Sequence, residues 1–144
     1  MQDDILGPID FLAVEFRNGR VTGMGFRPLM DLVERDIIRV LDLEFIVKSD
    51  EDAVRKTELD AIEHDADVDV AAWQAAESGL LDESDVEIVA ANLAPGSVAG
   101  IVVYENIWVV PLIAAIDQSG ARIIGEGRVA SDDVLTALGV SDVA

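Results

Sequence analysis

Two stretches, IDFLAVEF at residues 9–16 and VAGIVVY at residues 98–104, organise the rest of the chain. Both are rich in β-branched and aromatic side chains, a composition typical of β-strands. Apolar residues fall on both faces of each stretch, which is typical of strands that are covered on both sides. We therefore expect both stretches to be central strands of one sheet.

After each of these strands the sequence predicts a helix and then a second strand. Pro28 suits the first position of a helix over 28–36. Residues 37–47 then alternate, so that Asp42 and Glu44 point away from the apolar face. In the second half Asn106 can cap a helix, and residues 121–129 follow as a strand weakened by two glycines.

This order predicts an α+β fold of the ferredoxin-like kind, a split β-α-β duplication with one antiparallel sheet. The two halves are residues 9–47 and 97–129, with the first strand of each half at the centre of the sheet. All 144 residues form a single domain. Residues 130–144 add a terminal helix, capped by Ser131, and a tail.

The halves are separated by an acidic, helical insert over residues 48–96. A polar edge strand is expected at 53–59, followed by a flexible acidic stretch at 60–70. Helices are expected at 71–79 and from Ser84 to Leu93, where Ser84 and Glu87 match a capping box.

The charge is strongly negative, with 29 Asp and Glu against 10 Lys and Arg and a formal net charge of −19. Such a surface repels phosphate backbones, so nucleic acid is excluded as a general partner. The chain has no cysteine, which excludes disulfides and thiolate metal sites. Its first ten residues, MQDDILGPID, do not resemble a signal peptide, and we expect a cytoplasmic protein.

One apolar stretch, Ser97 to Ile116, has the length of a membrane-spanning helix. Glu105 and Asn106 lie in its middle, and a central charge costs about 2.5–3.5 kcal/mol on insertion. Pro111 also breaks the run. A buried strand, a turn and a helix are therefore expected, without membrane association.

A glycine- and arginine-rich loop precedes Pro28 and is the clearest candidate for ligand binding. It lies between a strand and a helix N-terminus, the place where anions bind. It lacks the third glycine of a dinucleotide motif and the Gly-Lys-Ser/Thr of a phosphate-binding loop. A small anion or nucleotide would contact Arg17, Arg20, Gly23, Gly25 and Arg27.

No residue pattern specifies a reaction, and no catalytic residue, metal ligand or cofactor is assigned. The acidic run from Glu63 to Asp69 lacks the glycine and closing glutamate of a calcium loop. Its single His64, without cysteine, does not suggest zinc or a catalytic triad. Asp42, Glu44, Glu105 and Glu126 are carboxylates on or beside strands, and the sequence alone does not place them together.

The central strands carry apolar residues on a face that two helices cannot cover. Either the helices of the insert or a second subunit covers them, and an open patch would be an association site. The favoured function is a non-catalytic, self-associating interaction or accessory module, with a homodimer as the first expectation. The alternative is a regulatory domain that binds a small anion in the arginine loop. The interface or pocket residues would be Leu12, Val14, Ile101, Val103, Glu105, Asn106 and Trp108.

Three pieces of sequence carry a family resemblance: LVERDIIRVLDL, LAPGSVA and the YENIW turn. With them the chain, from about Gly7 to Val129, resembles a family of small bacterial proteins of unknown function. That family is similar in turn to a larger family of unknown function that carries a glycine-zipper apolar insert. The middle segment here is acidic and lacks that apolar run. The resemblance supports the fold and implies no reaction.

Overall fold

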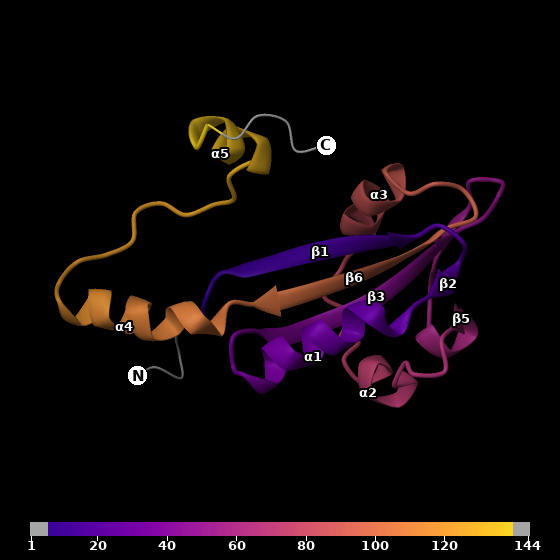
Figure 1. Ribbon diagram of the computed structural model, residues 1–144, viewed down its shortest axis with the longest axis horizontal. Helices are drawn as coiled ribbons and strands as arrows, with labels where there is room; N and C mark the ends of the chain where they lie inside the picture. The colour runs from indigo at the N-terminus through magenta and orange to yellow at the C-terminus, as the bar shows by residue number, and fades with distance from the viewer. Residues whose placement is uncertain (1–5, 140–144) are drawn as a thin grey trace.

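The computed structural model describes residues 6–139, and Figure 1 shows a four-stranded antiparallel sheet with helices on both faces. The strand order is β1-β6-β3-β4. The four strands are β1 (Ile9–Phe16), β3 (Arg39–Lys48), β4 (Val54–Thr57) and β6 (Val98–Glu105). The expected α+β class with an antiparallel sheet is confirmed, and residues 140–144 of the expected tail lie outside the described residues.

The strand β6 is the true centre of the sheet, as residues 98–104 predict. It pairs with β1 on one side and with β3 on the other, and nearly all of its residues are buried. The prediction that residues 9–16 form a second central strand is wrong. β1 is an edge strand, and the apolar residues on both of its faces remain largely exposed instead of being covered.

One face of the sheet carries α1 (Phe26–Glu34) and α2 (Val70–Gln74). A two-stranded parallel sheet of β2 (Arg20–Val21) and β5 (Glu63–His64) closes one end of this layer. Trp73 of α2 packs against Phe26 of α1, with ring centroids 4.9 Å apart. The core beneath them contains Val21, Leu43, Phe45, Leu59, Ile62, Val68, Val98 and Val102.

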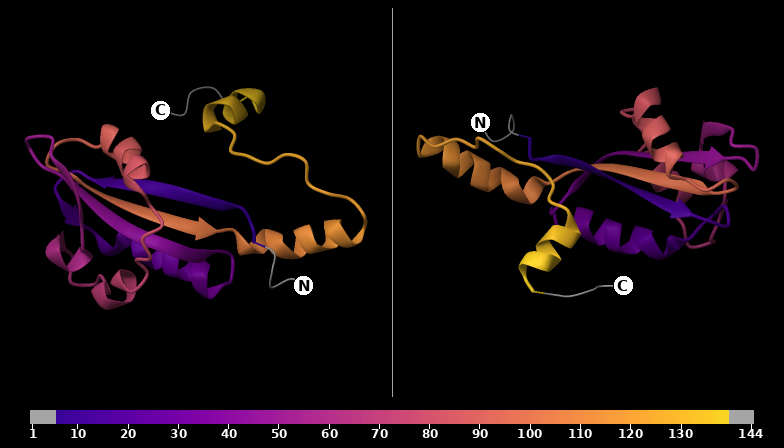
Figure 2. Two further views of the ribbon diagram at one scale, coloured as in Figure 1. Left: turned by 180° about the vertical axis from the view of Figure 1, so that it is seen from behind. Right: turned by 90° about the horizontal axis from the view of Figure 1, so that it is seen from above.

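The opposite face is covered in its middle by α3 (Glu83–Ala91), as Figure 2 shows from above. Its core contains Ile46, Ala90, Leu93, Ala99 and Ile101. Lys48 of β3 donates hydrogen bonds of 3.0 Å to the carbonyl oxygens of Ala90 and Leu93, which satisfies the end of the helix. The capping box at its start is formed by Asp82 and Asp85, not by the predicted Ser84 and Glu87.

Beyond β6 the chain leaves the sheet. A short 3-10 turn (Ile107–Val109) leads into α4 (Val110–Gln118), which extends away from the body in all views (Figures 1 and 2). Residues 121–130 are exposed and belong to no strand, so the predicted strand at 121–129 is wrong. A last helix, α5 (Ser131–Ala137), follows. We call residues 110–130 the C-terminal arm.

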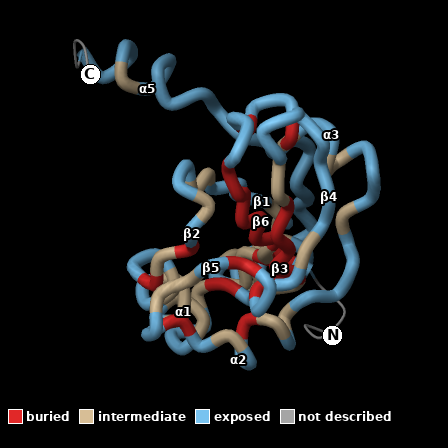
Figure 3. Tube along the Cα trace, turned by 90° about the vertical axis from the view of Figure 1, so that its right-hand side faces the viewer, coloured by how far each residue is buried: buried red, intermediate tan, exposed pale blue. Residues whose placement is uncertain are grey.

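Most residues of β6 and the middle of β3 are buried, with further buried positions in β2 and in the insert, whereas β1 and the arm are mostly exposed (Figure 3). Among the described residues no helix is both long enough and apolar enough to cross a membrane. The stretch from Ser97 to Ile116 divides into β6, the 3-10 turn and part of α4, as its charge and proline predict.

Candidate functional site

An apolar groove lies on the α1 face of the sheet, between β1 and α1. Its volume is about 400 Å³. The side chains of Leu12 and Val14 form its outer side and remain 49% and 50% exposed. Phe26, Leu29 and Leu32 of α1 form the other side, and Gly100 and Val102 of β6 lie at the bottom.

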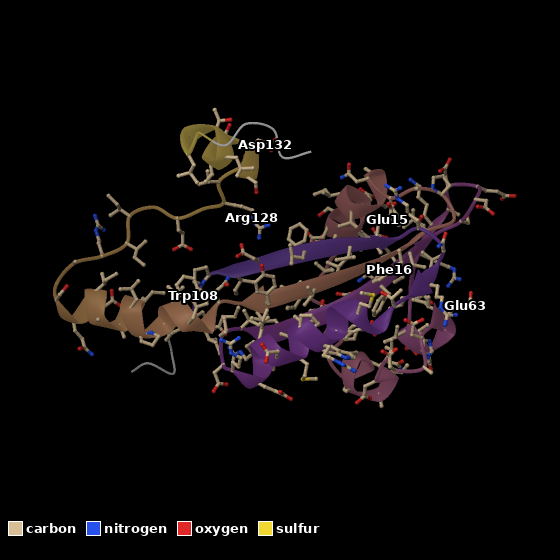
Figure 4. The ribbon with its side chains drawn as sticks, in the orientation of Figure 1. Glu15, Phe16, Glu63, Trp108, Arg128 and Asp132 are labelled. Carbon is tan, nitrogen blue, oxygen red and sulfur yellow. The ribbon has the colours of Figure 1, made fainter. Side chains whose placement is uncertain are left out.

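The groove exists because α1 covers β3 and β6 but does not reach the edge strand. Phe16, at the end of β1, is half-buried against the core (Figure 4), whereas Leu12 and Val14 nearer the middle have no helix above them. Exposed β1 side chains on the other face, such as Phe11, add to this uncovered edge. β1 also has one edge that pairs with no strand among residues 6–139.

The structure separates the four core residues that the sequence placed in one interface. Leu12 and Val14 lie on the α1 face, beside Val102 and Gly100 of β6. Ile101 and Val103 point to the opposite face and are buried there. Ile101 packs with residues of α3, so helices of the insert cover this part of the sheet, one of the two solutions left open by the sequence.

At the end of β6 a hydrogen-bonded cluster ties three segments together. The buried Glu105 carboxylate accepts a 2.8 Å hydrogen bond from the Gly7 N–H and forms an ion pair with Arg39. Asn106 donates from its backbone N–H to the Pro8 carbonyl oxygen, at 2.8 Å, and from its side chain to the same oxygen, at 2.9 Å. We call Gly7, Pro8, Arg39, Glu105 and Asn106 the β6-end cluster.

Trp108 lies just past this cluster, in the 3-10 turn before the arm (Figure 4), and its side chain is exposed. Its backbone N–H donates to the carbonyl oxygen of Ile37 at 3.2 Å. Glu105 and Asn106 thus fix the direction in which the chain leaves the sheet and do not line the groove.

The arginine loop is occupied by the chain's own carboxylates. Arg20 forms ion pairs with Asp65 at 3.0 Å and with Glu63 at 3.4 Å. The Gly23 N–H donates to the second oxygen of Asp65 at 3.2 Å. The backbone hydrogen bond from Gly23 and the ion pair with Arg20 hold the pKa of Asp65 below its usual range.

The remaining residues of this candidate site do not converge. Arg17 is exposed and pairs with Glu15 (Figure 4), and Arg27 is exposed on the first turn of α1. Gly25 has open space where a side chain would stand. The acidic stretch 60–70 is docked here, with Ile62 and Val68 buried, and within residues 6–139 no cluster of three or more acidic or histidine side chains could hold a metal ion.

A buried carboxyl pair on β3 was not recognised from the sequence. Asp42 and Glu44 point away from the apolar α1 face, as the alternation predicts, but they are 0% and 2% exposed and therefore do not lie on a solvated face. The segment before α3 crosses above them and donates backbone hydrogen bonds: Ser78 N–H at 2.7 Å and Leu80 N–H at 3.1 Å to Asp42, and Leu81 N–H at 3.2 Å to Glu44.

The two carboxyl groups titrate differently because their partners differ. Burial and the hydrogen bond with Asp42 raise the pKa of Glu44. Burial opposes ionisation of Asp42 as well, but the hydrogen bonds from Glu44, Ser78 and Leu80 outweigh it and lower the pKa of Asp42. Glu44 is therefore the member of the pair that keeps its proton more readily.

Lys56 of β4 lies on the same face of the sheet as this pair. Its ammonium group is 2.8 Å from Glu44 Oε1 and also donates to the Leu81 carbonyl oxygen at 2.9 Å. A lysine on a neighbouring strand was the signal in the sequence that a carboxylate on β3 is paired and not solvated. The three side chains fasten the segment 77–81, which covers both carboxyl groups, to the sheet.

Of the comparisons with known proteins, the one with protein families found a match. No curated protein and no solved structure matched the chain. A family described as a family of unknown function (DUF6325) matches residues 5–144, which is nearly the whole sequence. The chain therefore belongs to this family of unknown function, DUF6325.

Proposed function

We propose that the chain is a non-catalytic module that acts by self-association, with the groove beside β1 as its docking surface. The observation that carries the proposal is the pair Leu12 and Val14, which remain about half exposed on the outer side of an apolar groove of about 400 Å³. An uncovered apolar surface beside a free strand edge is a typical association site.

The buried polar groups support a role without catalysis. The carboxyl groups with perturbed pKa values, Asp42 and Glu44, lie under the segment 77–81, where a substrate has no access. The groove itself is lined almost entirely by apolar side chains. In the arginine loop, Asp65 occupies the position that an anion would take, so the anion-binding alternative has less support.

The large negative charge opposes association, but salt screens the electrostatic repulsion between the two copies. The formal net charge of −19 makes two copies repel each other. This repulsion weakens at physiological salt, where the Debye length is about 8 Å, whereas apolar burial is not screened. Association is therefore expected to persist or strengthen as the salt concentration rises.

Sedimentation equilibrium over a range of protein and salt concentrations tests the proposal. Wild-type protein is expected to dimerise. Val14→Glu is expected to raise the dissociation constant of the dimer by about tenfold or more for each copy of the site, because burying one valine contributes about 1.5–3 kcal/mol. Val54→Glu is the matched control, because Val54 is also an exposed valine on an edge strand, at the opposite edge of the sheet. A wild-type protein that stays monomeric at high concentration and moderate salt contradicts the proposal.

A further inference from the structure

The occupant of the groove can be inferred from the part of the chain that leaves the sheet. We propose that two copies exchange their C-terminal arms: α4 of each copy lies in the groove of the other, and residues 121–129 pair with the partner's β1 as a fifth strand of its sheet. This inference rests on the self-association proposed above and names what associates. Reciprocal exchange of an identical element is a common route to dimers.

The direction of the arm is the first argument. β6 continues through the 3-10 turn into α4 without reversing, so α4 projects from the end of the sheet (Figures 1 and 2). Hydrogen bonds from Asn106 to Pro8 and from the Trp108 N–H to Ile37 hold this direction. In one chain these bonds point α4 away from the body, although Arg128 farther along the arm returns to Asp10 of β1, whereas α4 of a second copy can enter the groove with the bonds intact.

The second argument is that the arm and the groove both expose apolar side chains. In α4 the side chain of Leu112 is exposed, and Ile113 and Ile116 are only partly buried. In the extended segment Ile124 is 87% exposed. A single chain thus leaves apolar surface uncovered on both elements, and exchange buries both at once.

Charge supplies the third argument. The arm contains two acidic residues, Asp117 and Glu126, and two arginines, Arg122 and Arg128, so its formal net charge is zero. The whole chain carries −19. The arm is therefore a part of this acidic chain that can enter a second copy without adding negative charge to it.

The fourth argument is the match between the segment 121–129 and β1. Each is long enough to pair along the whole length of the other, and an antiparallel register with Arg128 opposite Asp10 also places Ile124 opposite Val14. Within one chain Arg128 already reaches Asp10, at 3.2 Å (Figure 4). The exchanged strand would keep this ion pair and complete the ferredoxin-like sheet that the sequence predicts.

Engineered disulfides test the exchange directly, because the chain contains no cysteine of its own. Val14→Cys and Ile124→Cys are made in separate full-length chains, one carrying a mass tag, and the two are unfolded in urea, mixed, refolded and oxidised in a glutathione buffer. In the proposed register opposite residues lie within disulfide distance, so a mixed covalent dimer is expected. Val14→Cys mixed with Val54→Cys is the control, because Val54 is an exposed residue of β4, at the opposite edge of the sheet.

The double variant Val14→Cys/Ile124→Cys distinguishes the remaining outcomes. A covalent dimer joined by two bridges supports exchange, and a covalent monomer shows that the arm folds back on its own chain, which overturns the inference. Sedimentation of the wild-type protein separates the two proposals. A dimer without the 14–124 bridge leaves self-association standing and rejects the arm as occupant, and a monomer without the bridge rejects both.

Discussion

Asp42 and Glu44 occupy positions on β3 that are separated by one residue, and both are removed from water. Their burial is tolerated because backbone N–H groups of Ser78, Leu80 and Leu81 converge on them and Lys56 supplies a positive charge. Gly79, with a φ of +73°, makes the turn that brings these N–H groups to one side. A buried carboxyl pair that is satisfied in this way fixes the path of the chain between α2 and α3.

Replacing Glu44 with glutamine is expected to change how stability depends on pH. The pKa of Glu44 is raised above its ordinary value of 4.5 by burial and by Asp42. The unfolded chain releases this proton at a lower pH than the folded chain, so the contribution of Glu44 to stability falls as the pH rises above 4.5. Glu44→Gln removes this loss. The melting temperature of the variant minus that of the wild type is therefore expected to increase as the pH rises from 4 to 7.5.

Glu87→Gln serves as the control for this comparison, because Glu87 is an exposed residue of α3. It measures the general effect of removing one negative charge from an acidic chain. Melting curves followed by circular dichroism give the difference at each pH. If both variants show the same pH profile relative to wild type, Glu44 does not have the raised pKa that we assign to it.

At the scale of the elements, the short helix α2 contributes one buried side chain, Trp73, to the core. Trp73 is 6% exposed and packs on Phe26, whereas the other tryptophan, Trp108, is 60% exposed. Trp73→Ala is expected to lower the free energy of unfolding by about 3–5 kcal/mol, as for large aromatic residues in cores. Trp108→Ala is expected to change it by less than about 0.5 kcal/mol. Urea denaturation followed by circular dichroism measures both, and equal losses would contradict the structure.

The elements that local signals define were predictable from the sequence. The alternation and composition of residues 9–16 and 98–104 gave strands at the observed positions, and Pro28 gave a helix within two residues of its observed start. The position of a strand within the sheet was harder to predict from the sequence. Two-sided apolar character suits a covered strand, but on β1 it marks a surface that a single chain leaves open.

Predicting the candidate site required knowledge of long-range pairing. Leu12 and Val14 were correctly grouped as uncovered residues, but strand register decides that Ile101 and Val103 lie on the other face. Asp42 and Glu44 look like solvated strand carboxylates until the segment 77–81, which is more than 30 residues away, is placed above them. Likewise, the arginine loop looks free until Asp65 is brought to it.

At the scale of the whole molecule, the charge makes stability depend on salt. With a formal net charge of −19, the folded chain concentrates repelling carboxylates that the unfolded chain spreads out. Raising the salt concentration from 0.01 M to 1 M shortens the Debye length from about 30 Å to about 3 Å. The melting temperature at low protein concentration is expected to rise over this range in both NaCl and KCl. A falling melting temperature would mean that the ion pairs outweigh the general repulsion.

The pairing of β1 with β6 also has a consequence for the newly made chain. β1 leaves the ribosome well before its partner β6, which begins only at Val98. At 5–20 residues per second, β1 waits for roughly 5–20 s before β6 is synthesised. During this time its apolar side chains are available to chaperones and to neighbouring nascent chains on the same messenger RNA, so the first encounter between two copies can take place before either is complete.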